Sequence, residues 1–316
     1  MKVAFHSRLL TERGSEGAML DYARLNRSVL GNESILCLPD QPEFAGNPLL
    51  KKWQEEFEVI QYQGKNDLGR KLKKDRAEVL YLTKPGPFDG FLVPGVKNCV
   101  HAQFLCDEFH GDTFAYLSPW MSRVMTGRET SFVPFYVPRF VSEQDLRGKL
   151  GIPKGAKVFG RHGGRDTFNI PFARRAVEDH ARKFPADHFI FLNTELIHGT
   201  QGLSNVHYLP ATVNSEGKAR FLASCDTMLH ARWHGETFGL AVGEFAALGK
   251  PVITFEGSRE RAHLEMLGDR ALRYCNRAEL EEILCSFTPR KASGTVYEEF
   301  ANPNRVMDLF RKIFLL

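Results

Sequence analysis

The sequence predicts an α/β protein that contains two Rossmann-like domains. Short apolar segments alternate with amphipathic segments of helical length, a pattern typical of a parallel sheet covered by helices. The alternation stops at a proline-containing stretch and then restarts, which indicates a second domain of the same kind. A length of 316 residues is sufficient for two domains of ordinary size.

The first series of elements lies within residues 1–140. Val3–Phe5 predicts a strand, and a polar loop from His6 to Gly17 leads into a helix with an apolar face. Further helices are expected at 47–57 and 67–75, and further strands at 34–38, 58–62, 79–83, 98–103, 114–117 and 131–133.

The second series lies within residues 141–302. A short helix over 145–153 is expected to close the linker. Strands are then expected at 157–160, 188–193, 206–209, 227–231 and 252–255, with helices near 171–183 and 215–224. A last helix, at 303–314, carries an apolar face that includes Val306, Phe310 and Ile313.

The composition is that of a globular protein with a small excess of basic residues. It is 43% hydrophobic and 25% charged, with a net charge of +4. This balance suits anionic substrates, and the lack of a dense Lys/Arg stripe argues against nucleic acid as a partner. One basic run predicts either a solvated helix face or a peripheral membrane contact for a lipid-linked acceptor. It consists of Arg70, Lys71, Lys73, Lys74 and Arg76.

Cysteine usage and hydropathy point to a cytoplasmic location. The six cysteines form no Cys-x-x-Cys pair, and several lie in apolar segments, as expected for free thiols in a reducing compartment. No segment resembles a signal peptide, and no apolar stretch approaches the roughly 18 residues that span a membrane.

The segment 234–254 carries the strongest functional pattern. Glu236 and Glu244 bracket seven residues. Glu236 is expected in a tight turn with Gly235 and Gly239, and Glu244 in a helix rich in small residues. A loop that leads into a helix N-terminus suits a diphosphate, and a carboxylate farther along the helix suits the vicinal hydroxyls of a sugar.

This segment resembles the Glu-x7-Glu signature of retaining GT-B glycosyltransferases, family 4 in particular. The Phe-Gly-Leu insert, the spacing and the Gly-Lys-Pro-Val-Ile tail all agree. The resemblance implies a GT-B fold, with two Rossmann-like domains facing across a cleft. Residues 1–140 would form the acceptor-side domain and 141–302 the donor-binding domain, with the helix at 303–316 packing back on the first. The opening Phe-His-Ser…Arg-Gly-Ser-Glu-Gly…Asp-Tyr-Ala also resembles short glycosyltransferases of large algal DNA viruses.

The resemblance assigns roles within this signature. Glu244 would bind the nucleotide ribose, and Glu236 would lie at the donor sugar. The backbone N–H groups of Phe238, Gly239 and Leu240 would meet phosphate or sugar. The alternative is that both glutamates are structural carboxylates at a helix cap.

A second loop, Phe159 to Arg165, follows the first strand of the second domain. Gly160 would let the backbone approach a ligand. Arg161 and Arg165 would hold the donor diphosphate by charge-assisted hydrogen bonds, as the resemblance implies for this position. The alternative is a glycine-rich turn with solvated arginines.

Three candidates lie in the first domain. Gly14 and Gly17, in the loop Arg13-Gly14-Ser15-Glu16-Gly17, would approach the donor phosphates or the acceptor, unless the segment is an ordinary turn capped by Ser15. His101, at a strand end, is similar in position to a histidine near the transferred sugar in the family. The alternative for His101 is a buried histidine with satisfied hydrogen bonds.

The sequence therefore predicts a retaining, metal-independent glycosyltransferase without a cofactor. Its substrate would be a nucleotide-diphosphate sugar, and its acceptor a hydroxyl of a glycan, lipid or protein-linked group. No Asp-x-Asp triplet and no pattern of metal-ligand spacing occurs. The alternatives are a sugar-nucleotide epimerase and a non-catalytic protein that binds sugar nucleotides or glycans.

Overall fold

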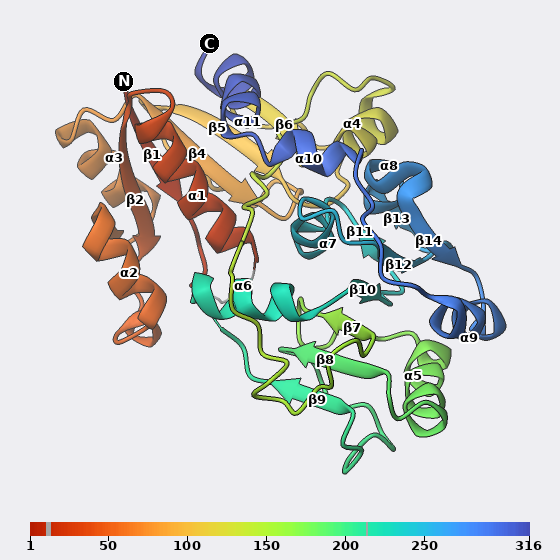
Figure 1. Ribbon diagram of the computed structural model, residues 1–316. Coiled ribbons are helices and arrows are strands. Elements are labelled where there is room, and N and C mark those ends of the chain that lie inside the picture. The colour runs from red at the N-terminus through yellow and green to blue at the C-terminus, as the bar shows by residue number, and fades with distance from the viewer. Residues whose placement is uncertain (11–13, 213) are drawn as a thin grey trace. The chain divides into compact units, whose positions relative to one another are not determined.

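The computed structural model describes residues 1–10, 14–212 and 214–316 (Figure 1). These residues form two compact units. Unit 1 comprises Met1–Tyr136 and Asn302–Leu316, and unit 2 comprises Val137–Ala301. Each unit contains one six-stranded sheet in which neighbouring strands are parallel, which confirms the prediction of two Rossmann-like α/β domains.

The sheet of unit 1 has the strand order β3-β2-β1-β4-β5-β6. The order reverses between β1 and β4, and in open parallel sheets ligands bind at the carboxyl ends of the strands near such a reversal. The strands are β1 (Lys2–His6), β2 (Glu33–Pro39), β3 (Glu58–Tyr62), β4 (Val79–Lys84), β5 (Lys97–Ala102) and β6 (Thr113–Tyr116). The helices are α1 (Gly14–Ser28), η1 (Pro42–Phe44), α2 (Pro48–Glu56), α3 (Lys65–Lys74), α4 (Pro119–Thr126), α11 (Pro303–Phe310) and η3 (Arg311–Leu315).

Aromatic side chains from distant parts of the sequence form the centre of unit 1. Phe5 and Tyr81, on neighbouring strands, are completely buried. Phe310 of α11 stacks on Phe5, with 6.1 Å between ring centroids, and lies 5.4 Å from Tyr81. Cys99 Sγ donates a hydrogen bond to the carbonyl of Phe314 at 3.1 Å. The last helical segment therefore completes the hydrophobic core of unit 1.

The sheet of unit 2 has the order β14-β12-β10-β7-β8-β9. Its strands are β7 (Val158–Arg161), β8 (His188–Leu192), β9 (Val206–Leu209), β10 (Thr227–His230), β12 (Val252–Phe255) and β14 (Ala271–Tyr274). Two short strands, β11 (Gly235–Glu236) and β13 (Glu260–Arg261), pair separately. The helices are α5 (Pro171–Lys183), α6 (Ser215–Ser224), α7 (Leu240–Ala246), α8 (Ala262–Leu267), η2 (Gly268–Arg270), α9 (Arg277–Ser286) and α10 (Val296–Phe300).

Two expected elements differ in the structure. The helix expected over 145–153 is a series of turns, because Gly151 adopts a positive φ of 68° and Arg147 uses its side chain to bond Ser224 and Asp226. The strand expected at 131–133 is reduced to a single bridge between Phe132 and Tyr116.

The basic run predicted as either a solvated helix face or a membrane contact lies mainly on α3, where Arg70 and Lys71 form ion pairs with Asp67 at 3.4 and 2.9 Å. These pairs suit a solvated helix face. Within the described ranges, no helix combines the length and the apolar character needed to cross a bilayer.

Gly160, expected to let the backbone approach a ligand, has a packing role in the structure. It lies in the buried strand β7, and a Cβ atom there would be 2.3 Å from Cys225 Sγ. Cys225 follows α6 directly and is completely buried. The missing side chain of Gly160 therefore allows this part of the chain to pack against the sheet.

We expect Gly160→Ala to lower the stability of unit 2 by about 1–3 kcal/mol, because the new methyl group overfills a packed interior. For a domain of this size, the unfolding midpoint should fall by roughly 2–4 °C for each kcal/mol. Gly148→Ala is the control, since a Cβ at Gly148 meets no atom within 4 Å. Equal midpoints for the two variants, measured by thermal unfolding without ligand, would contradict the packing role.

Candidate functional site

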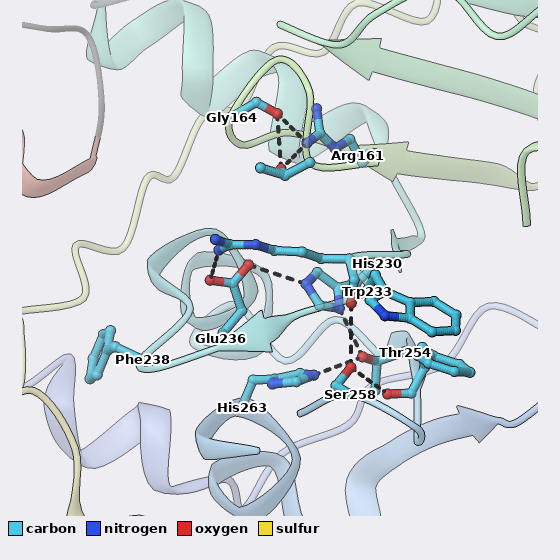
Figure 2. Close-up of polar contacts among 12 residues, drawn as sticks. Arg161, Gly164, His230, Trp233, Glu236, Phe238, Thr254, Ser258 and His263 are labelled. Carbon is cyan, nitrogen blue, oxygen red and sulfur yellow. Dashed lines mark hydrogen bonds and ion pairs between the residues drawn. The ribbon is translucent and has the colours of Figure 1, made fainter. Parts of the chain in front are cut away.

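The candidate site lies at the carboxyl edge of the sheet of unit 2. Because β7, β10 and β12 are adjacent and parallel, the segments that follow them emerge at the same edge. Figure 2 shows side chains from these segments around Glu236, with Arg161 at the end of β7. This edge is where parallel α/β sheets hold their ligands.

Glu236 is an accessible carboxylate held by two basic side chains. Its side chain is 19% exposed, Arg232 Nη1 donates to Oε2 at 2.6 Å, and His230 Nε2 lies 3.3 Å from Oε1 (Figure 2). Burial alone would raise the pKa of Glu236, but the hydrogen bond from His230 and the charge of Arg232 outweigh it and lower the pKa. Glu236 is therefore ionised at neutral pH.

The backbone around Glu236 depends on two glycines. Instead of the expected tight turn, Gly235 and Glu236 form the short strand β11, which pairs in parallel with Glu260 and Arg261 of β13. Gly235 has a φ of 75°, and a Cβ there would lie 2.0 Å from the carbonyl oxygen of Glu260. Gly239 has a φ of 82° and forms the N-cap of α7. Both positions therefore require glycine.

Glu244 is more deeply buried than Glu236, with only 1% of its surface exposed. Lys218 Nζ donates to Oε1 at 2.9 Å, and His162 Nε2 lies 2.9 Å from Oε2 without the alignment of a hydrogen bond. Burial would raise the pKa of Glu244, but the charges of Lys218 and His162 lower it to about 2. Glu244 is thus a buried, ionised carboxylate.

Arg161 connects two loops. The residue is buried, with 3% of its surface exposed. Nη1 donates to the carbonyl of Asn193 at 3.0 Å and to Thr194 Oγ1 at 2.5 Å, and Nη2 donates to the carbonyl of Gly164 at 2.5 Å and to Thr167 Oγ1 at 2.6 Å. Burial lowers the pKa of Arg161 to about 10, so the side chain stays charged. Both terminal nitrogens therefore bond the protein itself, and the predicted bonds to a diphosphate would have to replace or share these contacts.

Arg165 differs from Arg161 in exposure. It lies on the outside of the same loop, and its side chain faces solvent. Its carbonyl accepts a hydrogen bond from the N–H of Glu195 at 3.0 Å, which fixes its backbone near the segment after β8. Of the two arginines predicted to bind phosphate, Arg165 is the accessible one.

The next three predicted residues lead into α7. The ring of Phe238 is buried between Tyr297 and Phe300, with centroid distances of 5.7 and 6.1 Å. The carbonyl of Phe238 accepts a hydrogen bond from the Tyr297 hydroxyl. Gly239 caps the helix, and Leu240 begins it. The side chain of Phe238 thus belongs to the core, while the predicted role of the three backbone N–H groups stays a prediction.

In unit 1, the expected loop around Gly14 and Gly17 is the first turn of α1. Both glycines are exposed there, and Arg13 lies outside the described residues. Ser15 is inside the helix instead of capping it, and its hydroxyl donates to Glu16 Oε2 at 2.8 Å. The prediction of a loop at Gly14–Gly17 was therefore wrong, since these residues are helical, and the alternative of a turn capped by Ser15 was wrong as well.

His101 belongs to the core of unit 1. It is completely buried, its Nδ1 is 2.6 Å from the hydroxyl of Tyr81, and its Nε2 is 3.3 Å from the carbonyl of Tyr116. The rings of Phe135 and Phe314 pack against it. Burial lowers the pKa of His101 to about 4. This environment corrects the prediction of a histidine beside the sugar and matches the alternative of a buried histidine with satisfied bonds.

Several residues around the two glutamates were not singled out from the sequence. Arg232 lies four residues before Glu236, a spacing that could have suggested the pair. Nothing in the spacing connects Lys218 with Glu244, since the two come from different helices. The residues missed are His162, Lys218, His230, Arg232, Thr254 and His263. Across 1–10, 14–212 and 214–316, no group of three His, Cys, Asp or Glu side chains has the arrangement of a metal site.

We expect Arg161→Ala to destabilise unit 2 by about 2–3 kcal/mol even without ligand, because it removes charge-assisted hydrogen bonds that hold two loops. Amide hydrogen exchange should quicken in residues 163–167 and 193–195. Arg165→Ala, which removes an exposed side chain, should change stability by less than about 0.5 kcal/mol. Unchanged exchange in Arg161→Ala would contradict the connecting role.

The comparisons with known proteins add support for the fold. No family model and no curated protein matches the sequence, so the resemblance to viral enzymes stays a prediction. Solved structures do match. HepE from Anabaena in complex with UDP-glucose has a TM-score of 0.65 and 15% identity, covering 99% of this chain and 95% of its own.

Two further structures are similar over nearly their whole length. WaaG, a glycosyltransferase involved in lipopolysaccharide biosynthesis, has a TM-score of 0.61 and 15% identity, covering 99% of this chain and 97% of its own. UDP-GlcNAc 2-epimerase from Neisseria meningitidis, bound to UDP-GlcNAc, has a TM-score of 0.61 and 12% identity, with both chains covered completely. These similarities show that the two Rossmann-like domains have the GT-B fold.

Proposed function

We propose that this protein is a retaining glycosyltransferase. It would move a hexose or related sugar from a nucleotide-diphosphate sugar to a hydroxyl of a glycan, lipid or protein-linked acceptor. The observation that carries the proposal is the pair of carboxylates, Glu236 and Glu244, each held by basic side chains near the carboxyl edge of the sheet of unit 2. Solved proteins of the same fold were captured with UDP and UDP-sugars, which supports a ligand of this class.

In this proposal Glu244 accepts hydrogen bonds from the ribose hydroxyls. An ionised carboxylate has only acceptor sites, and the two oxygens of Glu244 face Lys218 Nζ and His162 Nε2, each at 2.9 Å. Lys218, whose side chain is 25% exposed, is the neighbour that would move aside for the ribose. Its ammonium group would then lie beside the nucleotide, where its charge favours an anionic ligand.

The diphosphate would bind near Arg165 and the backbone N–H groups at the start of α7. Positive charge and oriented N–H groups stabilise the negative charge that develops when the leaving diphosphate departs. Arg161 would hold the loop that carries Arg165. Because arginines and backbone groups supply this stabilisation, the proposed reaction requires no divalent metal and no cofactor.

The chemical step exchanges one bond at the anomeric carbon for another. The bond from that carbon to the leaving phosphate oxygen breaks, and the acceptor oxygen forms a new bond on the same face, which retains configuration. The proton of the acceptor hydroxyl passes to the departing phosphate oxygen. Glu236, accessible and ionised, would lie beside the sugar, where its negative charge stabilises positive charge at the anomeric centre.

A second candidate is a sugar-nucleotide epimerase. The similarity to UDP-GlcNAc 2-epimerases favours it, and Glu236 and His230 are residue types that act as general bases and acids. The two candidates differ in their need for an acceptor. Epimerisation of a UDP-sugar without acceptor would support the epimerase, whereas release of UDP that depends on an acceptor supports the transferase.

We expect one of UDP, GDP, ADP and CDP to raise the unfolding midpoint, with or without EDTA. A ligand at one hundred times its Kd stabilises the native state by about 2.7 kcal/mol. Glu244→Gln should abolish this shift, because the neutral amide is a weaker acceptor for ribose hydroxyls. Glu282→Gln, which changes an exposed carboxylate on α9, is the control and should keep it. No shift with any nucleotide would contradict the donor site.

We expect Glu236→Gln to reduce turnover on the order of 10²-fold, since it removes a charge placed beside the reacting sugar. Binding of the free nucleoside diphosphate should stay within about threefold, because Glu236 is assigned to the sugar and not to the nucleotide. Calorimetry and acceptor-dependent UDP release measure the two quantities. Normal turnover in this variant would remove Glu236 from the sugar site.

A further inference from the structure

A chain of hydrogen bonds through three buried side chains leads away from Glu236 (Figure 2). His230 Nδ1 is 2.8 Å from Thr254 Oγ1, and His263 Nε2 is 3.1 Å from the same oxygen. At its other nitrogen, His230 faces the carboxylate of Glu236. The chain thus runs from His263 through Thr254 and His230 to the one accessible carboxylate of the glutamate pair.

This hydrogen-bond chain is almost entirely shielded from water. Thr254 and His263 are completely buried and His230 is 5% exposed. His263 Nδ1 has no well-aligned hydrogen-bond partner within the described ranges, although the backbone of Glu236 interacts with this ring. Burial, together with the neighbouring His230, Arg261 and Arg232, lowers the pKa of His263 well below its ordinary value, so this ring is neutral.

With both rings neutral, the number of protons leaves two arrangements, whereas a doubly protonated His230 would donate from both nitrogens and break the single direction of the chain. Thr254 has one hydroxyl proton and lies between two imidazole nitrogens, so it donates to one ring and accepts from the other. In the first arrangement, His263 Nε2–H donates to Thr254, and Thr254 donates to His230 Nδ1. His230 Nε2–H then donates to Glu236. In the second arrangement every bond is reversed, and a bare His230 Nε2 faces the carboxylate.

An electrostatic cost favours the first arrangement. The second directs the lone pair of His230 Nε2 at the ionised Oε1 of Glu236, 3.3 Å away, which is repulsive. In the first arrangement the same nitrogen donates a charge-assisted hydrogen bond to this carboxylate.

We propose that His263, Thr254 and His230 form a one-directional hydrogen-bond chain that keeps a proton on His230 Nε2 and so holds the Glu236 carboxylate ionised in one orientation. The inference rests on the proposed function, because it takes Glu236 as the carboxylate beside the donor sugar. All three are positioning residues that act through Glu236. The titratable and charged groups around Glu236 are Arg161, His230, Arg232, Glu260, His263 and Tyr297.

The first test reads the tautomers directly and needs no substrate. In the ¹⁵N-histidine-labelled full chain, protonated and bare ring nitrogens give well-separated NMR shifts. His230→Gln and His263→Gln assign the two rings. We expect both rings to carry the proton on Nε2 at neutral pH. A proton on Nδ1 of His230 would overturn the proposal.

The second test removes the central hydroxyl. Thr254→Val keeps the β-branched shape but breaks both hydrogen bonds, whereas Thr254→Ser keeps the hydroxyl and is the matched control. In Thr254→Val we expect the single tautomer of His230 to be lost and the acid limb of kcat to move to higher pH, because Glu236 loses an oriented donor. At neutral pH, kcat should fall about tenfold with KM little changed.

The outcomes separate this proposal from the proposed function. An unchanged His230 tautomer and pH profile in Thr254→Val would overturn the chain, even if nucleotide binding is normal. If no nucleotide binds but the wild-type tautomers are as expected and Thr254→Val disrupts them, the chain stands and the donor assignment fails.

Discussion

The parallel register of β10 between β7 and β12 determines the arrangement of the candidate site. It sets His230 directly beside Thr254 on neighbouring strands, with their side chains on the same face of the sheet. It also places the end of β7, with Arg161, at the same edge. A shift of one residue would turn His230 to the other face and separate it from Glu236. The polar site therefore depends on strand pairing that apolar residues enforce.

Glu236 and Glu244 carry the same chemical group, but they differ in burial and in the charges around them, and the proposed function gives them different roles. Both are ionised, but Glu244 is enclosed by Lys218 and His162, whereas Glu236 is partly exposed beside Arg232. Removing one partner of a buried ion pair leaves an uncompensated charge, which is strongly destabilising. Glu244 is thus coupled to the stability of its domain more tightly than Glu236.

The sequence predicted the sheets well because strands covered on both faces must be apolar, and that pattern is local. The strand 252–255 was located to the residue for this reason. The sequence predicted the surroundings of the candidate site residues less well. His101 and Arg161 look like site residues at strand ends, but their burial depends on aromatic rings and carbonyls contributed by distant segments. The Lys218–Glu244 pair joins two helices, and no spacing rule connects them.

Unit 1 is built from two segments that are far apart in the sequence, so it cannot be completed until the end of the chain has been synthesised. The chain leaves this unit at Tyr136 and returns at Asn302. The hydrogen bond from Cys99 to the carbonyl of Phe314 therefore joins residues 215 positions apart. A ribosome therefore releases the strands of unit 1 long before the aromatic residues that cover them. Until Phe310 and Phe314 emerge, Phe5 and Tyr81 lack part of their cover, and this surface is open to aggregation or to a chaperone. Unit 2, continuous in sequence, has no such delay.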